Sequence, residues 1–171
     1  MKYFLFILLL TNAANCISQT TGNPISFENV IKTDSIISKS ALYQSALQWF
    51  AETYKSSNEV IQLKDTSGII VGKASFNAFL KGFGLAPSTS RYIDYVIRLN
   101  FKDSKVKVTI EKFNDGGYIV TDGEPEYKGM GSKTAKKYYE QLKESISTFS
   151  NGIQLSLQSW FAKIEFGKND W

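Results

Sequence analysis

Residues 38–76 read SKSALYQSALQWFAETYKSSNEVIQLKDTSGIIVGKASF, and they decide the fold because they predict one amphipathic helix that leads directly into a β-hairpin. Ser38 is a favourable N-cap for this helix. After it, apolar residues recur every three or four positions, which places them on one side of an α-helix. This stripe comprises Leu42, Tyr43, Ala46, Leu47, Trp49, Phe50 and Tyr54. The opposite, polar side is expected to carry Gln44, Ser45, Gln48 and Glu52.

The hairpin is predicted from two runs rich in β-branched residues, at 60–63 and 69–71, which flank a turn sequence at 65–68. Loops of two and of three residues both fit this turn. The two lengths bury opposite faces of the strands, because side chains alternate between the faces. The register of this first hairpin therefore stays open.

Three pieces of this region, FENV at 27–30, WFAETYKSSNEVIQLKD at 49–65 and GIIVGKASF at 68–76, resemble the start of the domain of unknown function 4468 family, a group of exported bacterial proteins. The resemblance covers about residues 25–115. It implies an α+β fold like that of the TATA-binding protein (TBP-like), with a curved antiparallel sheet, helices on one face and the order β-α-β-β-β-β-α. The family has no established activity, so the resemblance implies no catalytic residues.

The N-terminus is typical of an exported protein. Lys2 precedes an apolar run at 3–10 that is too short to span a bilayer as a helix and has the length of a signal-peptide core. A cut after Ser18 would leave Gln19 first. A lipoprotein cut before Cys16 and an uncleaved membrane anchor are the alternatives. We therefore expect a signal peptide at 1–18.

The remaining residues, 19–171, are expected to form a single α+β domain, with the TBP-like core at about 25–115 and a helical region at about 132–165. Cys16 is the only cysteine, and the chain has no histidine. A chain cut after Ser18 therefore has no disulfide and no thiolate metal site, and it lacks the commonest general base. The formal net charge of +4 is mild. We expect no nucleic-acid binding, because an exported protein does not meet chromosomal DNA and a shared fold does not transfer function.

A second hairpin has a register that the sequence does specify. If Asp103 and Ser104 form a two-residue loop, apolar residues meet apolar residues on one face and polar residues meet polar residues on the other. The apolar pairs are Phe101–Val106, Leu99–Val108 and Ile97–Ile110, and the polar pairs are Asn100–Lys107 and Arg98–Thr109. A sheet with one apolar face implies helices on that face only.

The polar face of this hairpin is the candidate surface for a partner. A broad, flat face suits another envelope protein or an extended polymer better than a small molecule, which needs a concave pocket. The alternative is a face that is simply solvated. The candidate residues are Tyr92, Val96, Arg98, Asn100, Lys107 and Thr109.

An acidic, glycine-rich stretch follows at 114–131. Its carboxylates could in principle gather around a metal ion, but their spacing matches no calcium loop, and turn chemistry explains the Asp-Gly and Gly-Glu-Pro sequences. These carboxylates are Asp115, Asp122, Glu124 and Glu126. We predict no metal, cofactor or catalytic residue.

Two apolar stripes mark the C-terminal helical region, and the sequence Asn151-Gly152 lies between them. The region is therefore either one bent helix or two helices that meet at the glycine.

The sequence as a whole favours a non-enzymatic binding or assembly module of the cell envelope, in the periplasm or secreted. One alternative is a small hydrolase with a carboxylate site near residues 115–126. Another is a lipoprotein accessory subunit, which would contact the membrane through lipidated Cys16.

The cleavage prediction can be checked by intact-mass analysis of the protein recovered after export. We expect Gln19 as the first residue, because small side chains precede the proposed cut. A mass that corresponds to a lipid-modified Cys16 at the N-terminus would contradict this expectation and support the lipoprotein.

Overall fold

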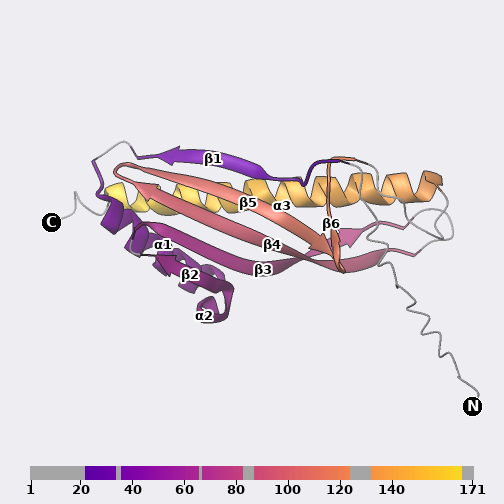
Figure 1. Ribbon diagram of the computed structural model, residues 1–171, viewed down its shortest axis with the longest axis horizontal. Helices are drawn as coiled ribbons and strands as arrows, with labels where there is room; N and C mark the ends of the chain where they lie inside the picture. Colours follow the sequence, from indigo (N-terminus) through magenta and orange to yellow (C-terminus); the bar gives the residue numbers. More distant parts are fainter. Residues whose placement is uncertain (1–21, 34–35, 66, 83–86, 124–131, 167–171) are drawn as a thin grey trace, which may run out of the picture.

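The structure is a computed structural model of the 171-residue chain, and it describes residues 22–33, 36–65, 67–82, 87–123 and 132–166 (Figure 1). The expected signal peptide at 1–18, including Cys16, lies outside these residues. Helices and strands follow one another in this order: β1 (Phe27–Lys32), α1 (Lys39–Thr53), α2 (Ser57–Val60), β2 (Ile61–Asp65), β3 (Ile69–Leu80), β4 (Thr89–Lys102), β5 (Lys105–Asp115), β6 (Tyr118–Ile119) and α3 (Ser132–Phe166).

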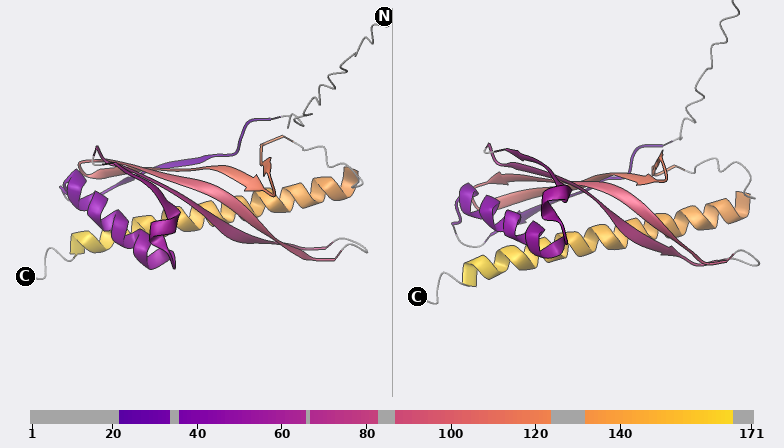
Figure 2. Two further views of the ribbon diagram at one scale, coloured as in Figure 1. Left: turned by 60° about the horizontal axis from the view of Figure 1, so that its bottom comes forward. Right: turned by 90° about the horizontal axis from the view of Figure 1, so that it is seen from below.

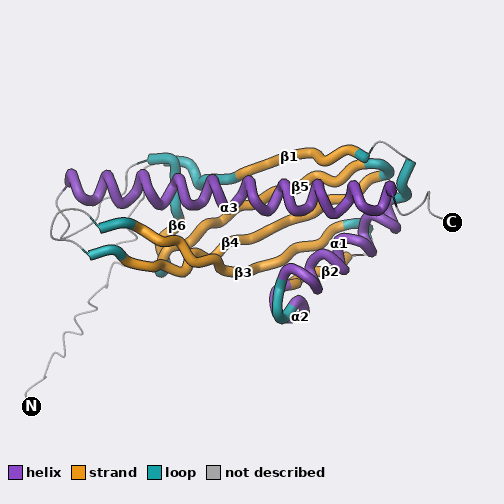
Figure 3. Tube along the Cα trace, turned by 180° about the vertical axis from the view of Figure 1, so that it is seen from behind, coloured by secondary structure: helices purple, strands orange, loops and turns teal. Residues whose placement is uncertain are grey.

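The strands form one antiparallel sheet in the order β1-β5-β4-β3-β2, and the two-residue strand β6 pairs with β5. The predicted α+β fold and the order β-α-β-β-β-β-α are confirmed, with the one-turn helix α2 and strand β6 as additions. Both long helices, α1 and α3, lie on the same side of the twisted sheet (Figure 2). Seen from that side, α3 runs along the sheet and α1 lies beside its C-terminal end (Figure 3).

The β4–β5 hairpin has the register that the sequence predicts, from Ile97–Ile110 to Phe101–Val106. The tip of this hairpin is hydrogen-bonded to the N-terminus of α1 and to the residue just before its N-cap. The Asp103 carboxylate accepts a hydrogen bond from the backbone N–H of Lys39 at 2.7 Å, and the Ser104 N–H donates to the carbonyl of Ile37 at 2.8 Å. The Ser38 hydroxyl accepts from the N–H of Ala41, which confirms the predicted N-cap.

The first hairpin has the longer of the two possible loops, since Asp65 pairs with Ile69 and Leu63 pairs with Val71. The Asp65 carboxylate accepts hydrogen bonds from the hydroxyl and the backbone N–H of Ser67, and these contacts hold the pKa of Asp65 below its usual value. Gly68 follows with φ +100°, a conformation that glycine adopts without steric cost. This loop places Leu63 and Val71 on the face away from the helices.

The core lies between the sheet and the two helices. Trp49 and Phe50 of α1 are buried as predicted, and Phe50 packs so closely on β3 that a Cβ at Gly72 would lie 2.9 Å from the Phe50 ring. The ring of Tyr54 stacks on Phe50, and its hydroxyl lies 2.7 Å from that of Tyr95. Burial raises the pKa of both phenols, so each stays protonated and one donates to the other.

One residue of α1 was assigned to the wrong side. Ser45 was expected on the polar side, but it is buried against α3, where its carbonyl and hydroxyl both accept from Trp160 Nε1 at 2.9 Å. In the reverse direction, Trp49 Nε1 donates to the hydroxyl of Ser156 at 3.0 Å. A second buried face exists on α1 because the helix contacts α3 as well as the sheet.

The C-terminal region is one helix, because α3 continues through Asn151 and Gly152. Both residues are exposed, so the glycine costs helix propensity but creates no gap in the core. The Phe149 ring stacks on Phe76 of β3, with 4.1 Å between centroids, and contacts Tyr95 edge to face. These rings join the middle of α3 to the centre of the sheet.

Phe50→Ala should lower the free energy of unfolding by about 3–5 kcal/mol, because it removes a fully buried ring from contact with Tyr54 and Gly72. The matched control is Gln48→Ala on the exposed side of the same helix, which should change stability by less than about 0.5 kcal/mol. Urea titration followed by circular dichroism measures both values. Equal losses of stability in the two variants would show that the buried face of α1 is assigned incorrectly.

Candidate functional site

The face of the sheet away from α1 and α3, called here the outer face, contains all the residues that the sequence singled out for partner binding. On β4 and β5 the buried residues alternate with those that point to the outer face. The register brings Asn100 beside Lys107 and Arg98 beside Thr109. Tyr92 and Val96 follow on the same side of β4. Their shared position is observed, and their binding role stays a prediction.

Ion pairs with two acidic residues partly neutralise the cations of the outer face. Lys107 Nζ lies 2.8 Å from a carboxylate oxygen of Glu28 on β1, and a guanidinium nitrogen of Arg98 lies 3.7 Å from Glu111 on β5. All four side chains are between about a quarter and a little over half exposed, so water screens both pairs. The outer face is therefore a mixed-charge surface and not a simple basic patch.

Neither of these acidic residues was among the candidates that the sequence pointed to. Glu111 lies two residues beyond Thr109, so strand alternation alone could have placed it on the outer face. Glu28 carried no such signal. It faces Thr109 only because β1 pairs with β5, a contact between segments far apart in the chain.

The β2 side of the outer face is more apolar. Leu63 pairs with Val71, which pairs in turn with Arg98, and Ile69 pairs with Asn100. Leu63 is about half exposed, and Ile69 and Val71 are partly exposed. Sequence reasoning could not place them here because it left the first hairpin's register open.

At the other end of the sheet, β3 and β4 continue together past the end of β5. The last pair that β4 makes with β5 is Ile93–Asp115, whereas its pairing with β3 extends to Leu80–Thr89. Two aromatic side chains are strongly exposed on this projecting ribbon: Phe79 is 61% exposed and Tyr92 is 73% exposed.

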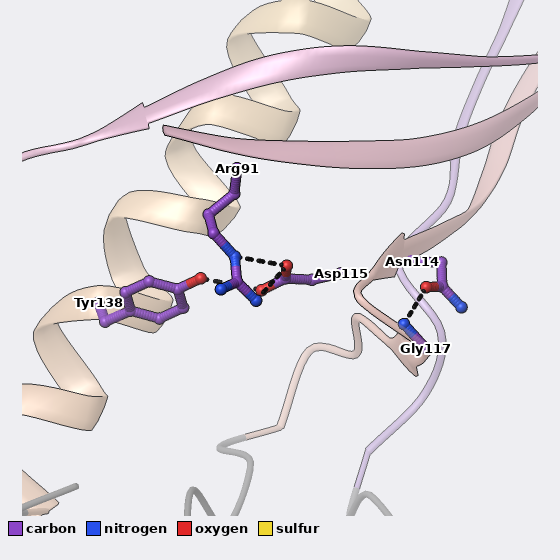
Figure 4. A network of polar contacts seen from close by, with 5 residues as sticks. All are labelled: Arg91, Asn114, Asp115, Gly117 and Tyr138. Carbon is purple, nitrogen blue, oxygen red and sulfur yellow. Dashed lines mark hydrogen bonds and ion pairs between the residues drawn. The ribbon is translucent and has the colours of Figure 1, made fainter. Parts of the chain in front are cut away.

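The inner face at this end holds a buried acid, Asp115. One of its oxygens lies 2.9 Å from a terminal guanidinium nitrogen of Arg91 on β4 and accepts from Arg91 Nε at 3.0 Å (Figure 4). The other oxygen accepts from the hydroxyl of Tyr138 on α3 at 2.9 Å. Both carboxylate oxygens are thus engaged, and the contacts join two strands to the N-terminal half of α3.

A β-bulge puts Asp115 on the inner face. Lys112 and Phe113 of β5 together oppose Tyr95 of β4, and Lys112 takes the left-handed conformation with φ +59°. The extra residue reverses the alternation, so Phe113 and Asp115 are buried in place of Lys112 and Asn114. Glycines 116 and 117, both with positive φ, then turn the chain into β6, and the N–H of Gly117 donates to the Asn114 side chain.

The other carboxylates of the acidic stretch do not join Asp115 in the described part of the chain. Asp122 accepts from the backbone N–H of Asn23 at 2.7 Å, while Glu124 and Glu126 lie outside the described residues. Among the residues that the structure describes, no group of three acidic, histidine or cysteine side chains is placed to hold a metal ion.

The Asp115 contacts give a test of their own. Tyr138→Phe should lower the free energy of unfolding by about 1.5–3 kcal/mol, since it removes a hydrogen bond to a buried carboxylate. Tyr118→Phe, at an exposed tyrosine on β6, is the control and should cost less than about 0.5 kcal/mol. Urea unfolding compares the two, and equal costs would mean that Tyr138 does not bind Asp115.

Comparison with known proteins agrees with this architecture. A crystal structure of a DUF4468 family protein from Bacteroides ovatus ATCC 8483 matches with a TM-score of 0.53 and 15% identity, over 78% of this chain and 86% of that one. A TBP-like protein from Parabacteroides distasonis ATCC 8503 matches with a TM-score of 0.55 and 11% identity, over 82% of this chain and 97% of that one. At such identities the likeness shows the fold alone.

A search of curated proteins finds no match to the chain. The family model described as "Domain of unknown function (DUF4468) with TBP-like fold" matches residues 27–115, which is more than half of the chain and includes β1 to β5. The chain therefore belongs to the DUF4468 family and has its TBP-like fold.

Proposed function

We propose that the chain is a non-enzymatic binding or assembly module of the cell envelope, and that its outer face contacts another envelope protein or an extended polymer. The observation that carries this proposal is the outer face itself, a broad surface that α1 and α3 leave uncovered (Figure 2). A family described only by its fold adds no activity to the argument.

The composition of the outer face supports binding to a large partner. Arg98 and Tyr92 are of residue types enriched in protein interfaces, and Leu63, Val71 and Val96 supply apolar area beside them. Arg98 and Lys107 each already have an acidic neighbour. A partner would therefore have to match an alternating pattern of charge, which favours specificity more than raw affinity.

The residue types of the chain and the contacts of the described side chains support a non-enzymatic role. The chain has no histidine, and Arg91 and Tyr138 already occupy both oxygens of the buried carboxylate of Asp115. A general base needs an oxygen within reach of a substrate proton. No observation in the described residues favours the hydrolase alternative near residues 115–126.

The cellular location is proposed from the N-terminal sequence alone. Lys2 and the apolar run after it are typical of a signal peptide, which would direct the chain to the periplasm or the medium. No helix in the described ranges has the length and apolar content needed to cross a membrane. The lipoprotein reading differs from this proposal only at Cys16.

The double change Arg98→Glu and Lys107→Glu tests the outer face. Tagged wild-type protein should retain a specific partner from envelope extracts, and the double variant should lose it, because two cations become anions beside Glu28 and Glu111. Co-purification followed by mass spectrometry identifies protein partners. Binding to isolated envelope polysaccharide identifies a polymer.

A control variant changes the net charge by the same amount at positions outside the sheet. Lys55→Glu with Lys133→Glu alters two exposed lysines that lie outside the sheet, beyond α1 and at the start of α3. This variant should keep the partner. A folded Arg98→Glu, Lys107→Glu protein that retains every partner of the wild type would overturn the proposal, and circular dichroism establishes that it is folded.

A further inference from the structure

One edge of β3 has backbone groups with no strand beside them among the residues that the structure describes. The N–H of Phe101 donates to the carbonyl of Gly68 at 2.9 Å, so these two residues occupy a hydrogen-bonded position of the ladder. In an antiparallel ladder, such pairs alternate with pairs whose backbone groups point outward. The β3–β4 register is unbroken from Ile69 to Leu80. The N–H and C=O groups of Ser75, Asn77 and Phe79 therefore point away from β4.

No described strand occupies the space toward which these groups point. Strand β2 pairs with β3 only at Ile69–Gly72, and the short helix α2 that precedes β2 also contacts β3. At the far end, the backbone N–H and C=O of Lys81 both bond to the side chain of Gln141 on α3. Between these limits, residues 75–79 have no strand of the described ranges on this side, and we call this stretch the β3 edge.

The other long edge of the sheet is protected, and the β3 edge is not. Natural sheets guard their edges with charges, proline or bulges. The bond from the N–H of Thr33 to the carbonyl of Ser104 shows, by the same alternation, that the outward groups of β1 belong to Glu28, Val30 and Lys32. Two of these three residues are charged. Residues 75–79, Ser-Phe-Asn-Ala-Phe, contain no charge and no proline, and their ladder has no bulge.

We propose that the β3 edge binds an extended segment of another polypeptide, which adds to the sheet as a strand in line with β2. Ser75, Asn77 and Phe79 each present one N–H and one C=O, and these residues follow one another at intervals of about 6.8 Å along the strand. The six groups match the donors and acceptors of an extended chain. This site uses the backbone groups of the sheet edge, and it does not depend on the function proposed for the outer face.

The side chains around the β3 edge define the segment that fits. On the inner side, an added strand would lie beside Phe76, whose ring stacks on Phe149 of α3, and this contact favours an apolar residue. On the outer side it would lie beside the exposed ring of Phe79 and, toward β2, the exposed cation of Lys73. The segment is therefore expected to alternate apolar and polar residues, with an aromatic or β-branched residue near Phe79 and an acidic one near Lys73.

A displayed library of linear decapeptides, selected on the wild-type chain, tests this site. Asn77→Pro removes one outward N–H without removing a bond to β4, a position where sheets tolerate proline. Asn77→Ala changes the same side chain and keeps the N–H. We expect selected peptides to bind wild type and Asn77→Ala alike and to bind Asn77→Pro at least tenfold more weakly.

A second measurement leaves the protein unchanged and so does not depend on the folding of the proline variant. In an added strand, every second N–H of the peptide faces β3 and the others face away. Methylating the nitrogens that face β3 should abolish binding, and methylating the others should leave it unchanged. The Arg98→Glu, Lys107→Glu variant should bind the peptides like wild type, because neither residue borders the β3 edge. This result separates the site from the charged pairs of the outer face. Equal binding to folded Asn77→Pro, insensitivity to backbone methylation or failure to select any peptide would overturn the proposal. Sedimentation that shows a wild-type dimer lost in Asn77→Pro would also overturn it, because the occupant would be a second copy of the chain.

Discussion

The architecture depends on the strict alternation of β4 at the centre of the sheet. Every second side chain from Ile93 to Phe101 is buried, and this part of β4 pairs with β3 on one side and β5 on the other. A shift of one residue would turn that whole set of apolar side chains toward water. The alternation therefore fixes the registers of both neighbours and makes one face of the sheet apolar. That face has to be covered, and α1 and α3 cover it.

The two helices are not independent covers. Trp49 and Trp160 each donate an indole hydrogen bond across the helix pair, to Ser156 and Ser45 respectively. A buried indole N–H without an acceptor is costly, so these contacts specify how α1 sits beside α3. At the opposite end of α3, Tyr138 contacts Asp115. The long helix is thus held by aromatic residues at both ends, and the outer face of the sheet is left uncovered by it.

Much of the candidate surface followed from local pattern. Arg98, Asn100, Lys107 and Thr109 were placed correctly because the β4–β5 hairpin joins neighbouring segments, and pairing every apolar residue with another allows only one register. Glu28 could not be foreseen, since its contact with Lys107 requires β1 to pair with a strand that comes much later in the chain. The β3 edge could not be predicted from the sequence either. It exists because β2 is short and pairs only with the first residues of β3.

The sequence by itself determined the apolar stripe of α1 and the β4–β5 register, since each depends on residues close together in the chain and on fixed periods of 3.6 or 2. The order of helices and strands came from the resemblance to the family. Tertiary structure alone decided the loop length of the first hairpin, the burial of Ser45 and the inward position of Asp115. Each of the three depends on distant contacts. Asp115 faces inward because Lys112 occupies a bulge whose strain is offset by burying Phe113 and by pairing the carboxylate with Arg91 and Tyr138. No local period in the sequence predicts this bulge, because the contacts that offset its strain form only when β4, β5 and α3 have come together.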